Sequence, residues 1–193
     1  MARVIFVRHG ESEANVRKIV SSDIDGYALT SNGREQAKLA AEELRNIPID
    51  RLVTSPVQRA RETAGIISAS TGLSPVQDSR IIETSMGKFN NKPYHGLPEM
   101  KKADIGMESW ESHQKRFKDI LDEVDGTWVM VSHEFPIRSA IGLFLDLNEE
   151  ESYGIHIRYA SISVADTEKS ELYCIGSRFL SERVRRILEN RVG

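Results

Sequence analysis

Four short apolar runs of this 193-residue sequence are each followed by a residue that could do chemistry. The set comprises two arginines, two histidines and one glutamate. In chain order they are Arg8 and His9 after residues 4–7, Arg59 after 52–54, Glu83 after 75–82, and His133 after 128–131. Arginine has a planar fork of donors that fits the oxygens of a phosphate group. Histidine and glutamate add a nucleophile and a proton donor. The set predicts a site that binds an anion and acts on it.

Two common classes of phosphate-handling protein fit the sequence poorly. No glycine-rich loop ends in Lys-Ser or Lys-Thr, as the P-loop of nucleotide-binding proteins requires. Carboxylates that could hold a magnesium ion are scarce around the five residues. A magnesium-dependent phosphatase is therefore a poor fit.

The elements that must position these residues alternate between strands and helices. Strands are expected over residues 4–7, 52–54, 75–82 and 128–131, with edge strands over 155–164 and 172–175. Helices are expected after the N-cap Thr30, after Ser55 as N-cap with Pro56 in the first turn, over 110–124, from Pro136, and over 182–191. This alternation predicts an α/β fold with a mostly parallel central sheet and helices on both faces. Ligands of such sheets bind at the carboxyl ends of the strands, where the five residues would meet.

We expect one domain over residues 1–193 with a lid-like insertion at about 84–107. The periodicity stops there, and the stretch contains Gly87, Pro93, Gly96 and Pro98. A connection this long in a compact domain is usually functional or mobile.

Composition limits the partners. The formal net charge is −3, which disfavours a nucleic-acid binder but does not exclude a small anion in one pocket. The single cysteine, Cys174, excludes an intrachain disulfide. No apolar run is long enough for a signal peptide or a membrane span, so we expect a cytoplasmic protein that could form oligomers.

Four segments of the sequence together resemble the histidine phosphatase superfamily, also called phosphoglycerate mutase-like. They are Val7–Asn15 (VRHGESEAN), Leu29–Ala37 (LTSNGREQA), Thr54–Ala64 (TSPVQRARETA) and, after Glu83, Val131–His133 (VSH). Their order and spacing are family-like and span most of the chain. The resemblance implies a three-layer phosphoglycerate mutase-like sandwich.

The resemblance also implies roles. His9 would attack phosphorus and become a phosphohistidine, with its other ring nitrogen oriented by a backbone carbonyl. Arg8, Arg59 and His133 would bind the phosphoryl oxygens, and Asn15 matches a further phosphate-binding position. Glu83 would be the general acid and base, although Glu99 or Glu108 could serve if the insertion folds over the site.

Outside this set we expect no chemistry. His95, His113 and His156 are interpreted as solvated or structural, and the C-terminal arginines as a solvated helix face.

Two features depart from the family pattern. Glu134 stands where the family commonly has glycine after the second histidine, so its carboxylate would have to point away from a bound phosphate. Thr84-Ser85-Met86 follows Glu83 where the mutases carry Arg-His-Tyr, and residues 84–107 include no arginine to bind a substrate carboxylate.

The insertion is shorter than in the family's mutases and lacks their arginines, which favours a histidine acid phosphatase-type phosphomonoesterase acting on a small phosphorylated metabolite. For this activity the resemblance implies neither a metal nor an organic cofactor. The alternative is a mutase of phosphoglycerates primed by 2,3-bisphosphoglycerate. A catalytically silent module that binds a phospho-ligand or a protein is a third hypothesis.

Overall fold

A six-stranded sheet organises the part of the chain that the computed structural model describes, residues 2–93 and 102–190. Its strands are β1 (Ala2–Arg8), β3 (Arg51–Thr54), β4 (Val76–Gln77), β6 (Gly126–Ser132), β7 (Ile162–Asp166) and β8 (Glu171–Ser177). They lie in the order β4-β3-β6-β1-β7-β8. The first four are mutually parallel, and β7 and β8 continue the sheet in antiparallel fashion. The fold is therefore α/β with a mostly parallel sheet, as predicted.

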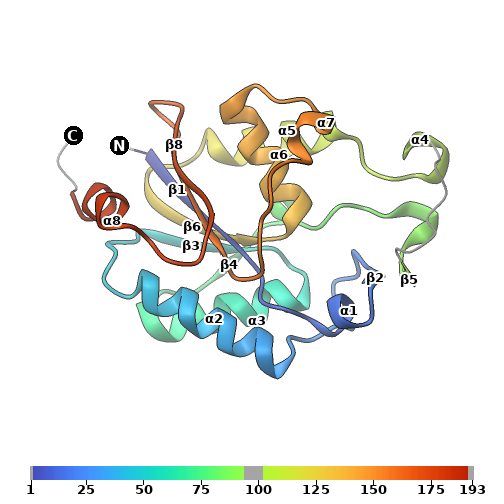
Figure 1. Ribbon diagram of the computed structural model, residues 1–193, viewed down its shortest axis with the longest axis horizontal. Helices are drawn as coiled ribbons and strands as arrows, with labels where there is room; N and C mark the ends of the chain where they lie inside the picture. The colour runs from blue at the N-terminus through green and yellow to red at the C-terminus, as the bar shows by residue number, and fades with distance from the viewer. Residues whose placement is uncertain (1, 94–101, 191–193) are drawn as a thin grey trace.

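Helices cover both faces of this sheet. On one face, α2 (Ser31–Leu44), α3 (Gln58–Thr71) and α8 (Glu182–Glu189) pack their small and branched residues against β1, β3 and β6. On the other, α5 (Trp110–Leu121) and α6 (Glu134–Leu145) cover β1 and β6 through Phe117, Ile137 and Ile141. Figure 1 shows α2 and α3 below the sheet and α5 and α6 above it. Because both faces are covered, every residue of β1 is buried, which explains its unbroken apolar run.

Two of the predicted strands are wrong in extent. Residues 75–82 form only the short β4, and a 3-10 helix, η1 (Ser79–Ile81), follows because the Asp78 carboxylate accepts the backbone N–H of Arg80. Residues 155–161 are a loop, and β7 begins at Ile162 in an interior position between β1 and β8. The Ile157 and Ile155 carbonyls of that loop accept hydrogen bonds from the side chains of Arg8 and Arg138, and Ser161 at its end accepts the backbone N–H of Arg8.

The helix predicted to follow Ser55 as N-cap begins two residues later, at Gln58. Its N-cap is Val57, and Ser55 accepts the Val57 backbone N–H at 3.3 Å. Thr30 is the N-cap of α2 as predicted, since its hydroxyl accepts the N–H of Gly33. The last helix, α8, ends at Glu189, and Arg191 lies outside the described residues.

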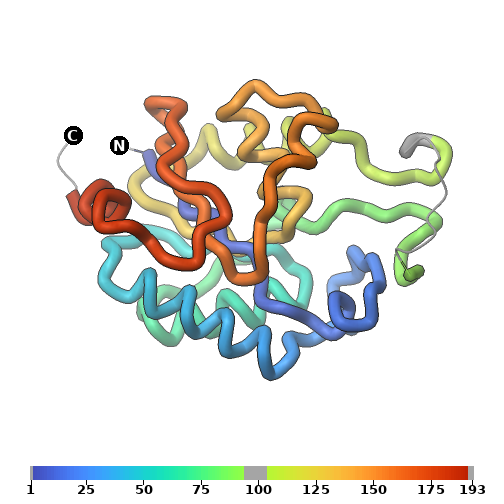
Figure 2. Tube along the Cα trace, in the orientation of Figure 1, coloured from blue at the N-terminus to red at the C-terminus, as the bar shows by residue number. Residues whose placement is uncertain are grey.

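A smaller arm projects beyond the carboxyl ends of the parallel strands. It combines α1 (Glu13–Val16) and the two-stranded sheet of β2 (Ile19–Val20) and β5 (Lys92–Pro93) with η2 (Gly87–Phe89) and α4 (Lys102–Ile105). In Figure 2 these segments gather on the right of the molecule, although β2 and β5 are far apart in the sequence. Asp23 fastens them together by accepting hydrogen bonds from the side-chain amides of Asn90 and Asn91.

The segment between Glu83 and α5 closes on itself. Met86 and Met107 form an isolated antiparallel bridge, and a Cβ on Gly87 would come within 2.0 Å of the Ile105 carbonyl oxygen. Residues 94–101, with His95 and Glu99, lie outside the described part of the chain. The lid function of the segment stays a prediction.

A short helix, α7 (Glu149–Ser152), completes the described elements. Among the described residues, no helix combines the length and the apolar character needed to cross a membrane.

Gly10 and Gly33 allow the loop after β1 to touch the first turn of α2. A Cβ on Gly10 would lie 2.2 Å from the Gly33 carbonyl oxygen, and one on Gly33 would lie 1.9 Å from the Glu11 carbonyl oxygen. Both obstacles are backbone atoms, so neither can rotate out of the way. The two glycines therefore hold residues 8–11 against α2.

We expect Gly33→Ala to lower the free energy of unfolding by about 1–3 kcal/mol, because its methyl group forces backbone apart. Gly65→Ala in α3 is the matched control. Its added methyl group would meet no described atom within 4 Å apart from its own helix backbone and chain neighbours, and alanine should raise stability by roughly 0.5–1 kcal/mol. Urea denaturation of both variants measures the difference. Equal stabilities would contradict the close approach.

Candidate active site

The His9 side chain is held in one tautomer by its surroundings. His9 is 1% exposed, and its Nδ1 lies 2.6 Å from the Gly10 carbonyl oxygen. A carbonyl oxygen only accepts, so Nδ1 carries the hydrogen and Nε2 presents its lone pair. Gly10 is itself fixed, because its N–H donates to the Thr63 hydroxyl at 3.1 Å. This is the carbonyl-oriented imidazole that the resemblance led us to expect.

Arg59 connects the histidine to the proposed acid and to the arm. Its Nε donates to His9 Nε2 at 3.1 Å, and its Nη2 donates to the Ser21 carbonyl at 3.0 Å and to Glu83 Oε2 at 3.2 Å. The side chain is buried in the first turn of α3. Because Nε occupies the lone pair of the predicted nucleophile, the guanidinium has to shift when phosphorus approaches His9.

Arg8 is positioned by the loop before β7. Its Nη1 donates to the Ile157 carbonyl at 2.6 Å, and its guanidinium lies 4.1 Å from the centre of the Tyr159 ring. Such stacking of a guanidinium on an aromatic ring is favourable and fixes its plane. Sequence analysis missed Tyr159, since a strand was predicted there and no pattern marks an aromatic partner for Arg8.

His133 faces His9 from the end of β6. It caps α6, its ring is fully buried, and the two imidazole centres are 5.1 Å apart. Its Nε2 lies 2.8 Å from the Ser55 hydroxyl, and its Nδ1 lies 3.4 Å from Glu83 Oε2. Ser55, predicted as a helix cap, therefore contacts a histidine of the site.

Glu83 lies between the two histidines and Arg59. Suitable atoms of His9, Glu83 and His133 all come within 4.8 Å of one another. The other carboxylate oxygen, Oε1, accepts the backbone N–H of Thr84 at 2.9 Å, so the carboxylate is fixed at both ends. Glu108, the alternative acid, is paired instead with Arg116 at 2.7 Å and with His113. The second alternative, Glu99, lies outside the described residues.

A cavity of about 690 Å³ opens over these residues. Arg8, Asn15, Arg59, Glu83 and Thr84 line it, together with Lys18, Glu134 and Arg138 and a largely apolar wall that contains Met86, Met107, Phe135, Tyr153 and Tyr159. Asn15 accepts hydrogen bonds from the backbone and hydroxyl of Ser12 through Oδ1, which leaves its amide hydrogens for a ligand. The structure thus brings all six predicted site residues together, while their roles stay predictions.

Burial keeps both histidines neutral. It lowers the pKa of His9 well below the usual value, and the positive charges of Arg59 and then Arg8 lower this pKa further. Burial is also the main cause of the lowered pKa of His133, followed by Arg59.

The charges around the cluster suit an anion better than a cation. His9, Glu83 and His133 have the donor types of a metal site, but Arg59 occupies the His9 lone pair, and the guanidinium charges of Arg59 and Arg8 would repel a metal ion. Two further donors, Arg8 Nε and Arg59 Nη1, are buried without a hydrogen-bond partner among the described residues. Unsatisfied buried donors cost about 1–3 kcal/mol each, and phosphoryl oxygens would satisfy them.

Thr84 is a site residue that sequence analysis missed. It is 2% exposed, its hydroxyl is buried without a partner in the described structure, and it lines the cavity beside Glu83. The only sequence signal was its place directly after the predicted acid.

The Glu134 carboxylate lines the cavity, where it contacts Arg8 Nη1 at 2.7 Å and Arg138 Nη2 at 2.5 Å. The sequence requires it to point away only from a bound phosphate, so that requirement stays a prediction. Of the remaining histidines, His113 is buried in α5 rather than solvated, and His156 is exposed.

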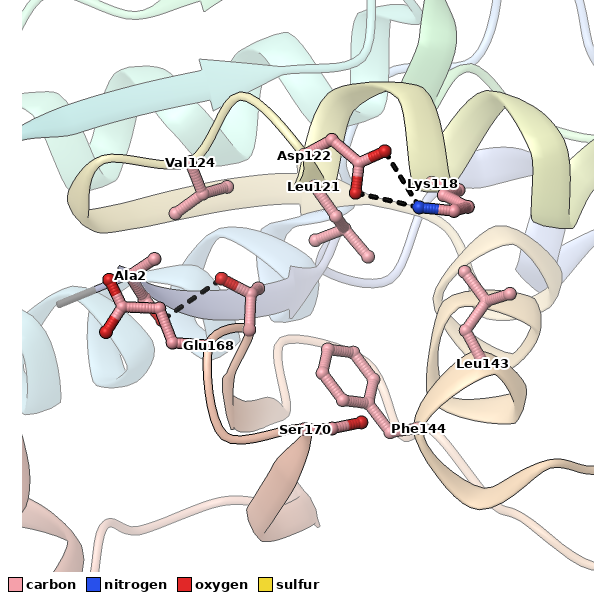
Figure 3. A pocket seen from close by; sticks show the side chains of 10 residues that line it. Ala2, Lys118, Leu121, Asp122, Val124, Leu143, Phe144, Glu168 and Ser170 are labelled. Carbon is pink, nitrogen blue, oxygen red and sulfur yellow. Dashed lines mark hydrogen bonds and ion pairs between the residues drawn. The ribbon is translucent and has the colours of Figure 1, made fainter.

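A second cavity, of about 460 Å³, contains none of the predicted residues. Figure 3 shows its apolar side chains, among them Leu121, Leu143 and Phe144, beside the ion pair of Lys118 and Asp122. It lies next to Ala2, where β1 begins, and hence at the end of the sheet away from His9.

The lowered pKa of His9 predicts that its neutral Nδ1–H tautomer persists as the pH falls through 6.5, where an ordinary histidine gains a proton. Nitrogen NMR of the ring, recorded between pH 7.5 and about 5.5, should show unchanged His9 signals. A His9 midpoint at or above 6.5 would contradict the buried, arginine-flanked environment.

Replacing Thr84 should separate stability from activity. Thr84→Val removes a buried hydroxyl that has no partner among the described residues and keeps the shape, so we expect the free energy of unfolding to rise by about 1 kcal/mol. Turnover should fall, and Thr84→Ser should restore it, because active sites keep groups that stability alone would not retain. A loss of stability in Thr84→Val would show that the hydroxyl has a structural partner.

Comparisons with known proteins agree with this geometry. The model of the histidine phosphatase superfamily (branch 1) matches residues 4–176. A 2,3-bisphosphoglycerate-dependent phosphoglycerate mutase of Thermoplasma acidophilum is 40% identical over 97% of this chain and 98% of its own. A Hydrogenobacter thermophilus protein provisionally named phosphoserine phosphatase 2 is 30% identical, over 89% of this chain and 94% of its own.

The fold also matches a solved structure. The mycobacterial glucosyl-3-phosphoglycerate phosphatase superimposes with a TM-score of 0.78 at 22% identity, over 92% of this chain and all of the other. With the family match over residues 4–176 and the buried His9, Arg59, Glu83 and His133 cluster, the chain belongs to the histidine phosphatase superfamily, branch 1.

Proposed function

We propose that the chain is a metal-independent phosphohydrolase that cleaves small phosphate monoesters through a phosphohistidine on His9. The observation that carries the proposal is the fixed His9 tautomer, in which the Gly10 carbonyl holds Nδ1–H and the Nε2 lone pair faces Arg59. Such an imidazole is neutral and correctly oriented to act as a nucleophile.

In the first step, a Nε2–P bond forms while the bond from phosphorus to the leaving oxygen breaks. Protonated Glu83 gives its proton to that oxygen, which departs as an alcohol. Arg59 moves from Nε2 to the phosphoryl oxygens, and Arg8, His133 and Asn15 stabilise the negative charge spread over them. Ligand-type atoms of His9, Glu83 and His133 already lie within 4.8 Å of one another, so their part in this step needs no rearrangement of the strands.

In the second step, the Glu83 carboxylate takes a proton from water as the water oxygen attacks phosphorus. The P–Nε2 bond breaks, its electron pair returns to Nε2, and inorganic phosphate is released. Glu83 is then protonated again and His9 is neutral, so the cycle closes without a further reactant.

The charges in the cavity support water as the acceptor. Phosphoglycerates carry a carboxylate, and a bisphosphoglycerate primer carries a second phosphate, so a mutase needs cations beyond those at the reacting phosphoryl group. In the described wall, Arg138 is already paired with Glu134, and Lys18 is the further cation. A substrate with a less charged leaving group fits this wall better.

A mutase is the second candidate, and one observation favours it. The Thermoplasma acidophilum relative named as a mutase aligns with 97% of this chain and over 98% of its own length. That protein is therefore of similar size, so the lack of a longer insertion does not distinguish the two activities. As a mutase, the chain would pass the phosphoryl group between His9 and a phosphoglycerate, with 2,3-bisphosphoglycerate as primer.

The proposal predicts metal-independent turnover and a phosphoenzyme. With p-nitrophenyl phosphate and a chelator, the protein should release phosphate, and quenched samples should carry acid-labile phosphate on His9. Labelling should disappear in His9→Ala and persist in His156→Ala, the exposed control. Labelling that survives in His9→Ala would disprove the role of His9.

The rate of turnover by Arg59→Met should be lower by a factor on the order of 10²–10³, because one charge-assisted contact to the transition state is removed.

Phosphoglycerates decide between the two candidates. With 3-phosphoglycerate and catalytic 2,3-bisphosphoglycerate, we expect slow release of phosphate and little 2-phosphoglycerate. Rapid interconversion of the phosphoglycerates, with little free phosphate, would instead identify a mutase.

A further inference from the structure

Among the residues that the structure describes, Glu134 is the acidic side chain that pairs with the predicted phosphate-binding Arg8. Its Oε2 lies 2.7 Å from Arg8 Nη1, and its Oε1 lies 2.5 Å from Arg138 Nη2. The side chain is 36% exposed and lines the cavity, so a ligand can reach it. Two arginines therefore share one carboxylate.

The position of Glu134 suits a negative charge in the free protein. It is the first residue of α6, where the helix dipole stabilises an anion. Its carboxylate also offsets the two guanidinium charges, one of which, Arg138, is further fixed by the Ile155 carbonyl at 3.2 Å. Once a phosphoryl dianion binds Arg8, the Glu134 carboxylate is repelled by the phosphoryl oxygens, because both anions then share one arginine.

Arg138 offers the carboxylate an alternative partner. Glu134 and Arg138 are one helical turn apart on α6, and their ion pair does not involve Arg8. The carboxylate can give up Arg8 and keep Arg138 without becoming unpaired. The free and the ligand-bound states then each leave Glu134 with an arginine.

We propose that Glu134 competes with phosphate for Arg8 and thereby sets how tightly the site holds inorganic phosphate. This inference rests on the proposed function, in which Arg8 binds the phosphoryl group. The carboxylate weakens the enzyme–phosphate complex and returns to Arg8 as the product leaves. Such a device serves a hydrolase, which must discharge free phosphate in every turnover.

The test compares Glu134→Gln with wild type in the binding of inorganic phosphate and of orthovanadate, measured by calorimetry. Glutamine keeps the size and one hydrogen-bond acceptor but removes the charge. We expect the dissociation constant for phosphate to fall on the order of tenfold, and the inhibition constant for phosphate in turnover assays to fall with it.

The matched control is Glu182→Gln in α8. Glu182 is also the first residue of a helix and pairs with an arginine four residues later, Arg186, but it is 87% exposed and outside the cavity. Its removal should leave phosphate binding unchanged. This control separates a local effect from a general change in net charge.

The sign of the change decides the inference. If Glu134 only oriented Arg8, its loss would loosen the guanidinium and phosphate would bind more weakly in Glu134→Gln. Weaker or unchanged binding therefore overturns the competition, whatever the activity. Glu134→Asp, with its shorter side chain, should lie between wild type and Glu134→Gln.

Failure of the proposed function has a different signature. A protein that binds phosphate more tightly as Glu134→Gln, yet forms no phosphohistidine, would keep this inference and refute the phosphohydrolase. If the protein forms phosphohistidine, and wild type and Glu134→Gln bind phosphate equally well, the phosphohydrolase is kept and the competition by Glu134 is refuted.

Discussion

The hydrogen bond from His9 Nδ1 to the Gly10 carbonyl oxygen is the interaction on which the site depends. It fixes the imidazole tautomer, and with it the nitrogen that the proposed function makes the nucleophile. The carbonyl is held in this position because Gly10 is bonded to Thr63 in α3 and pressed against Gly33 in α2. Two segments that are far apart in the sequence thus determine which nitrogen of His9 presents its lone pair. A substitution at Gly33 would therefore act on a side chain that another element carries.

The balance of charge in the site follows from burial. Arg59 is placed in the interior, where its charge is costly to desolvate, and Glu83 and the Ser21 carbonyl offset part of that cost. Burial and the same arginine keep His9 and His133 without charge. The site accordingly combines buried guanidinium donors with imidazoles whose pKa is lowered. A phosphoryl group entering it would meet donors that are already oriented, as stabilisation of a transition state requires.

The sequence predicted the α/β sheet and the residues that meet at its edge, because parallel strands deliver their following loops to one place. His9 and His133 came from two such neighbouring strands, β1 and β6. The orientation of Glu134 was beyond prediction, since its carboxylate is drawn inward by Arg8 and by Arg138, and Arg138 bore no signal in the sequence. The stretch 155–161 has the composition of a strand, but its carbonyls bind guanidinium groups, and only the folded chain shows that alternative. Local patterns identify which groups are present, whereas long-range partners decide where they point.

The bridge between Met86 and Met107 makes the segment between Glu83 and α5 a closed loop attached at its base. Chain enters and leaves at one point, just after Glu83 and just before α5, so changes in the length of the loop cost little in closure entropy and need not shift either neighbour. The two methionines also line the cavity of the candidate site. Under the proposed function, the fold would therefore separate two properties: the loop could diversify what the leaving group touches, while the residues proposed to bind the phosphoryl group stay where the sheet holds them.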